Sequence, residues 1–479
     1  MRASRRANGR LLRVLAPALA LAAAVAGAAP ASAASPDYTK GYDLGLEAWE
    51  YGLPLVKMDQ TFRTQTSVNV PDGRGRGPVN RFSHVRVLAD ASARDVVAPN
   101  NDTPYSIAWL DLRRQPMVIH VPRVNRYFVI PLYDPYTEDF RNLGSVAKTR
   151  PGDYAVLGPG QGHLKLPKGV HRIHSRYDRV WIIGRTLNFG PADLRNTRRI
   201  QDRYRIVPLS RYGTGYRPKP PKHPDTTPNE APMPTGLAFF DRLGGLLERF
   251  PPPAADRAEL GKLAQIGVGP GKQPSADSSL STEMRQGMID AVAAGPGVLQ
   301  TKVTQRYVQE SPKHNGWLVL PTGRYGTDYE FRALVTQVGL GALTPAESIY
   351  PVAQTDRTLA ALSGSNDYVV HFEPGRLPPV KAFWSLTLYD SSGFFVPNPI
   401  DRYAVGDRTE LTANPDGSLD IYVQSTEPAD PAQAKNWLPS PAGAPFRLTM
   451  RLYQPAAPQV PGIIDGTGWD PPTITRTGP

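Results

Sequence analysis

Short apolar runs alternate with turn-forming residues in two separate stretches of the chain. In the first half, runs rich in Val, Ile, Tyr and Phe lie at residues 105–112, 117–121, 127–132, 154–157 and 179–183. In the second half, similar runs lie at residues 368–372, 382–389, 419–423 and 446–453. Because Pro, Gly and Asp separate these runs, each stretch predicts closely spaced strands of a sandwich or barrel.

Helical periodicity lies before and between the two β stretches. Apolar residues recur at steps of four and three from Tyr42 to Val56, which predicts an amphipathic helix over residues 38–60. Pro54 lies inside that helix and predicts a kink or an end near Leu53. Residues 235–310 carry further helical stripes, and Asp328 is expected to cap another helix.

A second capping aspartate and a proline-rich segment follow the first β stretch. Asp193 is expected to cap a helix that begins at Leu194. Residues 213–234 contain seven prolines, so this segment is expected to be extended and to cross between parts of the molecule.

The order of these elements predicts an α+β fold that is mainly β, with two sandwich or jelly-roll-like domains around a helical middle. We expect a helix plus β domain over residues 34–212 and a C-terminal β domain over residues 328–479. The proline-rich segment and a helical insert would occupy residues 213–327 between them.

The first 33 residues have the pattern of a signal peptide. Five arginines precede an apolar run at residues 14–29, and Ala31-Ser32-Ala33 supplies small residues for cleavage. We therefore expect cleavage after Ala33 and a secreted protein, by general secretion or by the twin-arginine route that Arg5-Arg6 raises. No later segment predicts a membrane span.

Cysteine is absent, which excludes disulfides, thiolate metal sites and a cysteine nucleophile. The net charge of +12 falls to about +7 when the five leader arginines are subtracted. This mild positive charge suits contact with anionic cell-wall polymers, and the basic, tyrosine-bearing residues 195–222 are a candidate stretch for it. Secretion argues against nucleic acid as a binding partner. The sequence leaves open whether the protein forms a homo-oligomer.

Two acidic clusters in the first half are candidates for chemistry. One is Asn100 to Tyr105, which contains Asp102, and the other is Tyr133 to Asp139, which contains Asp134. Asp102, Asp134 and Asp139 could act as general acid and base, or could bind Ca2+ through oxygen ligands. The alternative is that these side chains bond nearby backbone in turns. The histidines show no zinc-binding spacing, so no other metal or cofactor is implied.

Aromatic, amide and basic residues provide candidate ligand contacts, because Trp and Tyr stack on sugar rings while Asn and Arg bond hydroxyl groups. Core packing is the alternative for each aromatic residue. We predict a ligand site where residues of the two halves meet, formed by Asn101, Tyr105, Arg126, Tyr133, Trp384, Tyr389, Arg402 and Asn436.

Several blocks of residues resemble a known pair of domains. Asn101 to Ser106 (N-D-T-P-Y-S), Arg126 to Val129 and Ile183 to Thr186 resemble domain of unknown function 1254. Pro378 to Asp390 and the later N-P-I-D-R-Y, N-W-L-P and R-L-Y blocks resemble domain of unknown function 1214. The resemblance implies an N-terminal β domain and a C-terminal jelly-roll-like sandwich, and it implies no activity.

Three functions stay open at this point. The first is binding of a glycan or another small polar ligand between or within the β domains. The second is a secreted hydrolase or lyase acting on sugars or cell-wall material, which needs two carboxyl groups about 5 to 10 Å apart. The third is a structural protein of the cell envelope.

Overall fold

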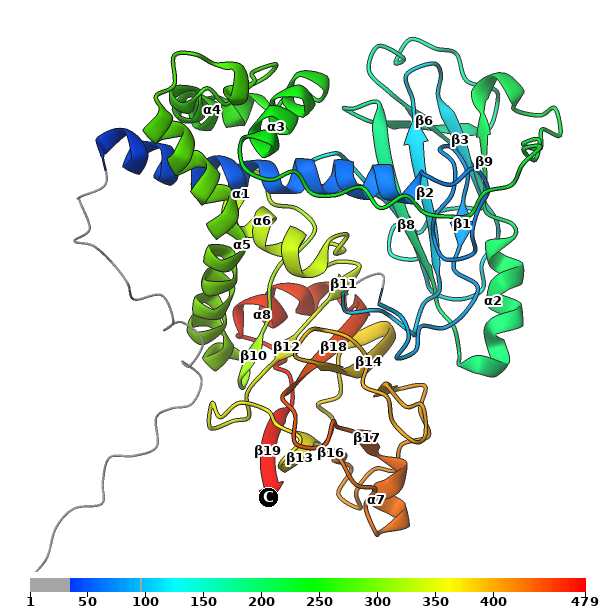
Figure 1. The fold of residues 1–479 in the computed structure, drawn as a ribbon. Helices are drawn as coiled ribbons and strands as arrows, with labels where there is room; N and C mark the ends of the chain where they lie inside the picture. Colours follow the sequence, from blue (N-terminus) through cyan, green and yellow to red (C-terminus); the bar gives the residue numbers. More distant parts are fainter. Residues whose placement is uncertain (1–34, 95–96) are drawn as a thin grey trace, which may run out of the picture.

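The computed structural model describes residues 35–94 and 97–479, so the predicted leader lies outside the described residues. Figure 1 shows an N-terminal β domain in cyan, a C-terminal β domain in yellow to red, and a group of helices beside them. The predicted α+β class, with sheet domains and helices in the middle of the chain, is confirmed. Within the described ranges, no helix combines the length and the apolar composition that crossing a membrane requires.

Helix α1 (Pro36–Gln65) begins at Ser35, whose hydroxyl accepts a hydrogen bond from the Tyr38 amide at 3.1 Å. Of the two outcomes predicted near Leu53, the helix end is wrong, because one helix continues through Pro54 to Gln65. Residues 51–56 are all buried. Burial of this segment therefore outweighs the hydrogen bond that proline removes.

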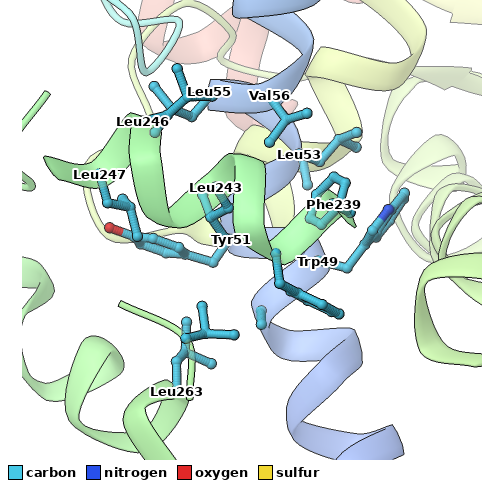
Figure 2. Close-up of a cluster of buried hydrophobic side chains, with 14 of the residues drawn as sticks. Trp49, Tyr51, Leu53, Leu55, Val56, Phe239, Leu243, Leu246, Leu247 and Leu263 are labelled. Atoms are coloured by element: carbon cyan, nitrogen blue, oxygen red, sulfur yellow. The ribbon is translucent and has the colours of Figure 1, made fainter. Parts of the chain in front are cut away.

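The C-terminal part of helix α1 packs on the N-terminal β domain, where Phe62 lies against Trp109 with ring centroids 5.2 Å apart, and the rest of the helix packs against the middle helices. Those helices are α3 (Leu237–Arg249), α4 (Arg257–Leu263), α5 (Thr282–Glu310) and α6 (Tyr329–Gly339). Figure 2 shows Trp49 and Tyr51 of α1 packed among Phe239 and Leu243 of α3, with Leu263 of α4 nearby. The helical core is thus assembled from segments about 200 residues apart in sequence.

Glycines bring α1 and α5 into close, parallel contact. A Cβ atom on Gly41 would lie 2.2 Å from the Met284 carbonyl oxygen, and one on Gly295 would lie 2.5 Å from the Trp49 ring. Since neither a helix backbone nor a buried indole can move far, these positions accept only hydrogen as a side chain.

The N-terminal β domain has two sheets that pack face to face around one apolar core. One sheet has the order β1-β2-β8-β4-β5 and the other the order β7-β6-β3-β9. The strands are β1 (Ser83–His84), β2 (Tyr105–Asp111), β3 (Met117–Val121), β4 (Phe128–Tyr133), β5 (Asp139–Gly144), β6 (Gly152–Leu157), β7 (Val170–His174), β8 (Arg179–Thr186) and β9 (Arg205–Pro208). Helix α2 (Leu194–Gln201) precedes β9.

The C-terminal β domain is also a pair of sheets around one core. One sheet has the order β10-β12-β18-β14-β15 with β11 beside β18, and the other has the order β17-β16-β13-β19. The strands are β10 (Trp317–Leu318), β11 (Ser348–Ile349), β12 (Val352–Ala353), β13 (Asp367–Phe372), β14 (Val380–Asp390), β15 (Ala404–Gly406), β16 (Leu419–Gln424), β17 (Trp437–Pro439), β18 (Phe446–Pro455) and β19 (Thr473–Gly478). Short helices α7 (Pro431–Lys435) and α8 (Val460–Asp465) complete the domain. Strand β10 lies before residue 328, so this sheet begins earlier than the predicted boundary.

Two α5 glycines test the close packing of α1 on α5. Gly295→Ala should lower the free energy of unfolding by about 1 to 3 kcal/mol, because its methyl group would overlap the Trp49 ring. Gly297→Ala is the matched control, since a Cβ atom there meets nothing within 4 Å and alanine favours the helix by about 1 kcal/mol. Chemical denaturation of both variants measures the difference, and equal effects would contradict the packing argument.

Candidate functional site

The residues of β14 divide between a core face and a face turned toward the N-terminal domain. Trp384, Leu386 and Leu388 point into the C-terminal core, where Trp384 packs against Phe372 with ring centroids 5.2 Å apart. Residues 383, 385, 387 and 389 lie on the opposite face, because side chains alternate along a strand. Tyr389 therefore faces the other domain, whereas Trp384 is a core residue.

Strand β18 adds polar residues to the same face. Arg451 pairs with Ser385 across the two strands, and Tyr453 pairs with Phe383. Arg451 donates to the Thr387 hydroxyl at 2.7 Å and also bonds the Tyr389 hydroxyl. All six side chains are buried, so this polar sheet face is covered by protein.

Residues 98–103, just before β2, cover this polar face and form the seam between the β domains. The Tyr389 hydroxyl donates to the Pro99 carbonyl at 2.6 Å, and Asn100 donates to the Tyr453 hydroxyl at 2.7 Å. Asp102 accepts hydrogen bonds from the Ser385 hydroxyl at 2.7 Å and from Arg408 at 2.5 Å. The predicted meeting of this segment with the C-terminal half is therefore present at Asp102 and Tyr389.

The Asp102 carboxylate is held ionised. Burial acts to raise the pKa of Asp102, but the charges of Arg408 and Arg451 and the bonds from Arg408 and Ser385 leave that pKa below its usual value. A carboxylate in this state is a poor general acid at neutral pH. Asp102 is thus suited to joining the domains.

A second group at the seam surrounds Arg185 of β8. Tyr105 lies opposite Arg185 on β2, and the Arg185 guanidinium carbon is 5.6 Å from the centre of the Tyr105 ring. Arg185 donates to the Gly341 carbonyl at 2.8 Å, and the Tyr133 hydroxyl donates to the same oxygen at 2.8 Å. Tyr350 lies close enough to interact electrostatically with Arg185, and burial raises the pKa of its hydroxyl. We call Tyr105, Tyr133, Arg185 and Tyr350 the Arg185 cluster.

Arg185 leaves one nitrogen unused in this cluster. Its Nη1 atom is buried and makes no hydrogen bond of normal geometry with the described residues. Tyr105 and Tyr350 are only partly buried, so some of their surface remains open to solvent. A buried guanidinium nitrogen without a partner is costly, which makes this position favourable for a polar ligand atom.

Two carboxyl groups near Arg185 have raised pKa values. Burial raises the pKa of Asp139 to about 6 and that of Glu347 to about 7. Asp139 accepts from Asn142 at 2.9 Å, and Glu347 accepts from the Tyr127 hydroxyl at 3.2 Å. Both side chains are almost inaccessible to solvent, at 0% for Asp139 and 2% for Glu347. Neither carboxyl group is therefore exposed to solvent.

Asp134 bonds the backbone of its own turn. Its carboxylate accepts from the amides of Tyr136 and Glu138 at 2.8 and 3.1 Å. Burial nevertheless raises its pKa to about 7. The turn arrangement that was the alternative for the acidic clusters thus describes Asp134.

The remaining predicted contacts lie apart from Arg185 or bind backbone. Arg126 pairs with Asp193, so Asp193 bonds Arg126 and makes no side-chain capping bond to α2. Arg402 donates to the Trp437 carbonyl at 2.9 Å, and Asn436 donates to the Asp420 carbonyl at 2.8 Å. Arg402 and Asn436 therefore stabilise loops of the C-terminal domain, while Asn101 lies half-buried beside Asp102 at the seam.

The sequence did not single out Arg185, Glu347, Tyr350, Arg408 or Arg451 as site residues. Arg185 and Arg451 each lie in a strand that is otherwise largely apolar, between buried neighbours. A charged residue in such a strand must find partners when it is buried, so this pattern was a usable signal. For Tyr350 and Glu347, no comparable signal exists.

The described residues contain no group of three or more His, Asp or Glu side chains arranged to hold a metal ion. A Ca2+ site at the acidic clusters stays a prediction.

Comparison with known proteins supports the two-domain arrangement. Residues 79–208 match the family described as "Protein of unknown function (DUF1254)", and residues 347–457 match "Protein of unknown function (DUF1214)". The chain is a DUF1254–DUF1214 protein. The two matches occur in the predicted order, and the Asp102 and Arg185 groups lie where these domains meet.

A solved structure shares the fold of this DUF1254–DUF1214 protein. The VPA0106 protein from Vibrio parahaemolyticus is 24% identical, with a TM-score of 0.63, and the match covers 91% of this chain and 100% of that one. A putative uncharacterized protein from Burkholderia cenocepacia is 13% identical, with a TM-score of 0.42 and coverage of 92% and 94%. No curated protein matches the chain.

Asp102→Asn should destabilise the protein by about 1 to 3 kcal/mol at pH 7, because the partly buried Arg408 would keep only Asp407 as a counter-charge and the buried Arg451 would lose a nearby one. The folded-state pKa of Asp102 is lowered, so its stabilisation is present above the unfolded pKa and is lost as pH falls through the folded one. The difference in the free energy of unfolding between wild type and variant should therefore decrease below about pH 4. Urea denaturation measures it, with the exposed Asp43→Asn as control.

Glu347→Gln should show the opposite pH dependence. Burial raises the folded-state pKa of Glu347 from 4.5 to about 7, so ionising it costs stability as pH rises across that window. The variant has no carboxyl group to ionise at this position. Its free energy of unfolding relative to wild type should therefore increase by up to about 3 kcal/mol between pH 4 and pH 8. Urea denaturation at both pH values checks this, with exposed Glu427→Gln as control. A difference that does not change with pH would contradict it.

Proposed function

We propose that this DUF1254–DUF1214 protein binds a small polar ligand carrying an acidic group at the seam between its β domains, and that a sugar acid is the ligand class. The observation that carries the proposal is the buried Arg185 Nη1 atom, which has no hydrogen-bond partner of normal geometry among the described residues. A guanidinium forms its strongest hydrogen bonds with carboxylates. The acidic group of the ligand would therefore bond Arg185.

Tyr105 and Tyr350 support the sugar part of the proposal. Both are partly accessible, and both lie near Arg185. Tyrosine offers an apolar ring that can pack on a sugar ring and a hydroxyl that can bond ligand hydroxyl groups. The cluster thus combines a charged anchor with two amphipathic side chains.

The hydrolase or lyase alternative has weaker support. Asp102 is bonded to Arg408 and Ser385, and Asp134 bonds the amides of its own turn. Asp139 is fully buried. A glycosidase needs two carboxyl groups that face a shared substrate site, and these three side chains do not provide that pair.

The proposal keeps the expected secretion of the mature protein, because the first 33 residues have the pattern of a leader. Sugar acids are components of many extracellular polysaccharides, so binding one is compatible with that location.

Calorimetric titration of the mature protein with D-glucuronate and with D-glucose tests the proposal. The two sugars differ by one carboxylate, so glucuronate should bind and glucose should bind at least about tenfold more weakly. Tyr105→Phe and Tyr350→Phe each remove one hydroxyl and should weaken glucuronate binding by about 2- to 10-fold.

Tyr216→Phe is the control, since Tyr216 lies in the proline-rich crossing segment away from the seam. Equal binding of both sugars, or glucuronate affinity that neither cluster variant changes, would overturn the assignment to the Arg185 cluster. D-galacturonate in place of glucuronate would test the orientation of the ring hydroxyls.

A further inference from the structure

The N-terminal β domain contains a small pocket away from the Arg185 cluster. It has a volume of about 200 Å³. It lies between β5, the turn at residues 145–150, β6 and β7. Its lining residues are Arg141, Asn142, Leu143, Ala147, Lys148, Thr149, Arg150, Tyr154 and His171.

All the charged residues that line this pocket are basic. Arg141, Lys148 and Arg150 supply three cationic side chains, all of them exposed, and no carboxylate lines the pocket. Cationic groups that converge on one hollow without a counter-charge attract an anion.

A larger pocket of about 360 Å³ shows the contrasting arrangement. It is lined by Arg113, Arg176 and Arg249. Arg113 pairs with Asp111, and Arg249 lies 3.7 Å from Asp178, which also lines the pocket. Its arginines are therefore partly neutralised by the protein itself, whereas those of the smaller pocket are not.

The base of the smaller pocket is held in place by hydrogen bonds and ring stacking. The Tyr154 ring stacks on His171 with centroids 5.0 Å apart, and its hydroxyl donates to the Arg150 carbonyl at 2.8 Å. The Thr149 hydroxyl accepts from the Gly144 amide at 2.8 Å. These contacts fix the backbone of the turn that carries Lys148 and Arg150 before a ligand arrives.

Asn142 adds an unpaired hydrogen-bond acceptor to the pocket. Its Oδ1 atom is buried and has no hydrogen-bond partner among the described residues, while its amide nitrogen donates to Asp139. An unpaired buried acceptor is satisfied by a ligand that also carries a donor such as a hydroxyl group. The pocket therefore suits an anion attached to a hydroxylated group.

We propose that this pocket binds a phosphate group carried by a polyol. The Arg141, Lys148 and Arg150 side chains bond the phosphate oxygens, and a polyol hydroxyl donates to Asn142 Oδ1. Tetrahedral phosphate with its several oxygens can accept bonds from all three cations at once. This site is independent of the sugar-acid site proposed at Arg185.

NMR titration of the mature protein with glycerol 3-phosphate tests the site, with glycerol and inorganic sulfate as matched probes. We expect shifts of the amides of residues 141–150, with sulfate weaker than glycerol 3-phosphate and glycerol silent. Lys148→Gln and Arg150→Gln should each weaken binding at least about fivefold, and together at least about tenfold. Binding should also weaken as NaCl is raised.

Lys168→Gln is the control, because it removes an exposed lysine from the same domain outside the pocket. Thermal unfolding of each variant verifies that the domain remains folded. The proposal is overturned if about 10 mM glycerol 3-phosphate produces no shifts in residues 141–150, or if the double variant binds like wild type.

A titration with a poly(glycerol phosphate) chain separates the two sources of the same chemistry. If the poly(glycerol phosphate) chain binds more tightly than glycerol 3-phosphate, and the Lys148 and Arg150 variants lose that binding, the ligand is a polymer. Equal binding of chain and monomer identifies a free polyol phosphate. Arg185→Lys should leave both titrations unchanged, which distinguishes a failure of this site from a failure at the Arg185 cluster.

Discussion

The buried Asp102 carboxylate is the constraint on which the relative position of the two β domains depends. A charge removed from water needs opposite charge and hydrogen bonds at close range. Arg408 and Ser385 of the C-terminal domain supply them, and Arg451 adds a second positive charge nearby. These partners satisfy Asp102 only when the two β domains lie in one relative position. The Asp102 contacts therefore fix that position.

Asp59 of α1 serves the same purpose between the helices and the N-terminal β domain. It is buried, and its carboxylate pairs with Arg179 of β8 at 3.0 Å and with Arg242 of α3. The charges of these arginines offset the effect of burial and leave the pKa of Asp59 below its usual value. Two buried carboxylates therefore connect the three parts of the molecule, beside the apolar contacts that also join them.

Much of the fold could be predicted from local sequence patterns, because apolar alternation and caps act over a few residues. The runs at 117–121 and 446–453 became strands β3 and β18, and Asp328 caps α6 by accepting from the Phe331 amide. The continuation of α1 through Pro54 could not be predicted, because packing around residues 51–56 decides it.

The site was only partly predictable for a related reason. Alternation along β14 places Tyr389 and Trp384 on opposite faces, but it does not say which face is the core. The partners of Asp102 are 283 and 306 residues away along the chain, and no local pattern connects them. Arg185 could have been noticed as a charge within an apolar strand, whereas its nearness to Tyr350 depends on the docking of two domains.

The glycine contacts of α1 with α5 also determine the order in which the chain can acquire structure. The positions that join these helices, such as Gly41 with Met284 and Trp49 with Gly295, are more than 240 residues apart. The N-terminal half of α1, which makes these contacts, therefore lacks its α5 partner until most of the chain has been made. The N-terminal β domain, whose sheets close within residues 83–208, can form well before then. The N-terminal half of α1 is thus among the last parts to reach its native contacts, whereas its C-terminal end can pack on the N-terminal β domain as soon as that domain has formed.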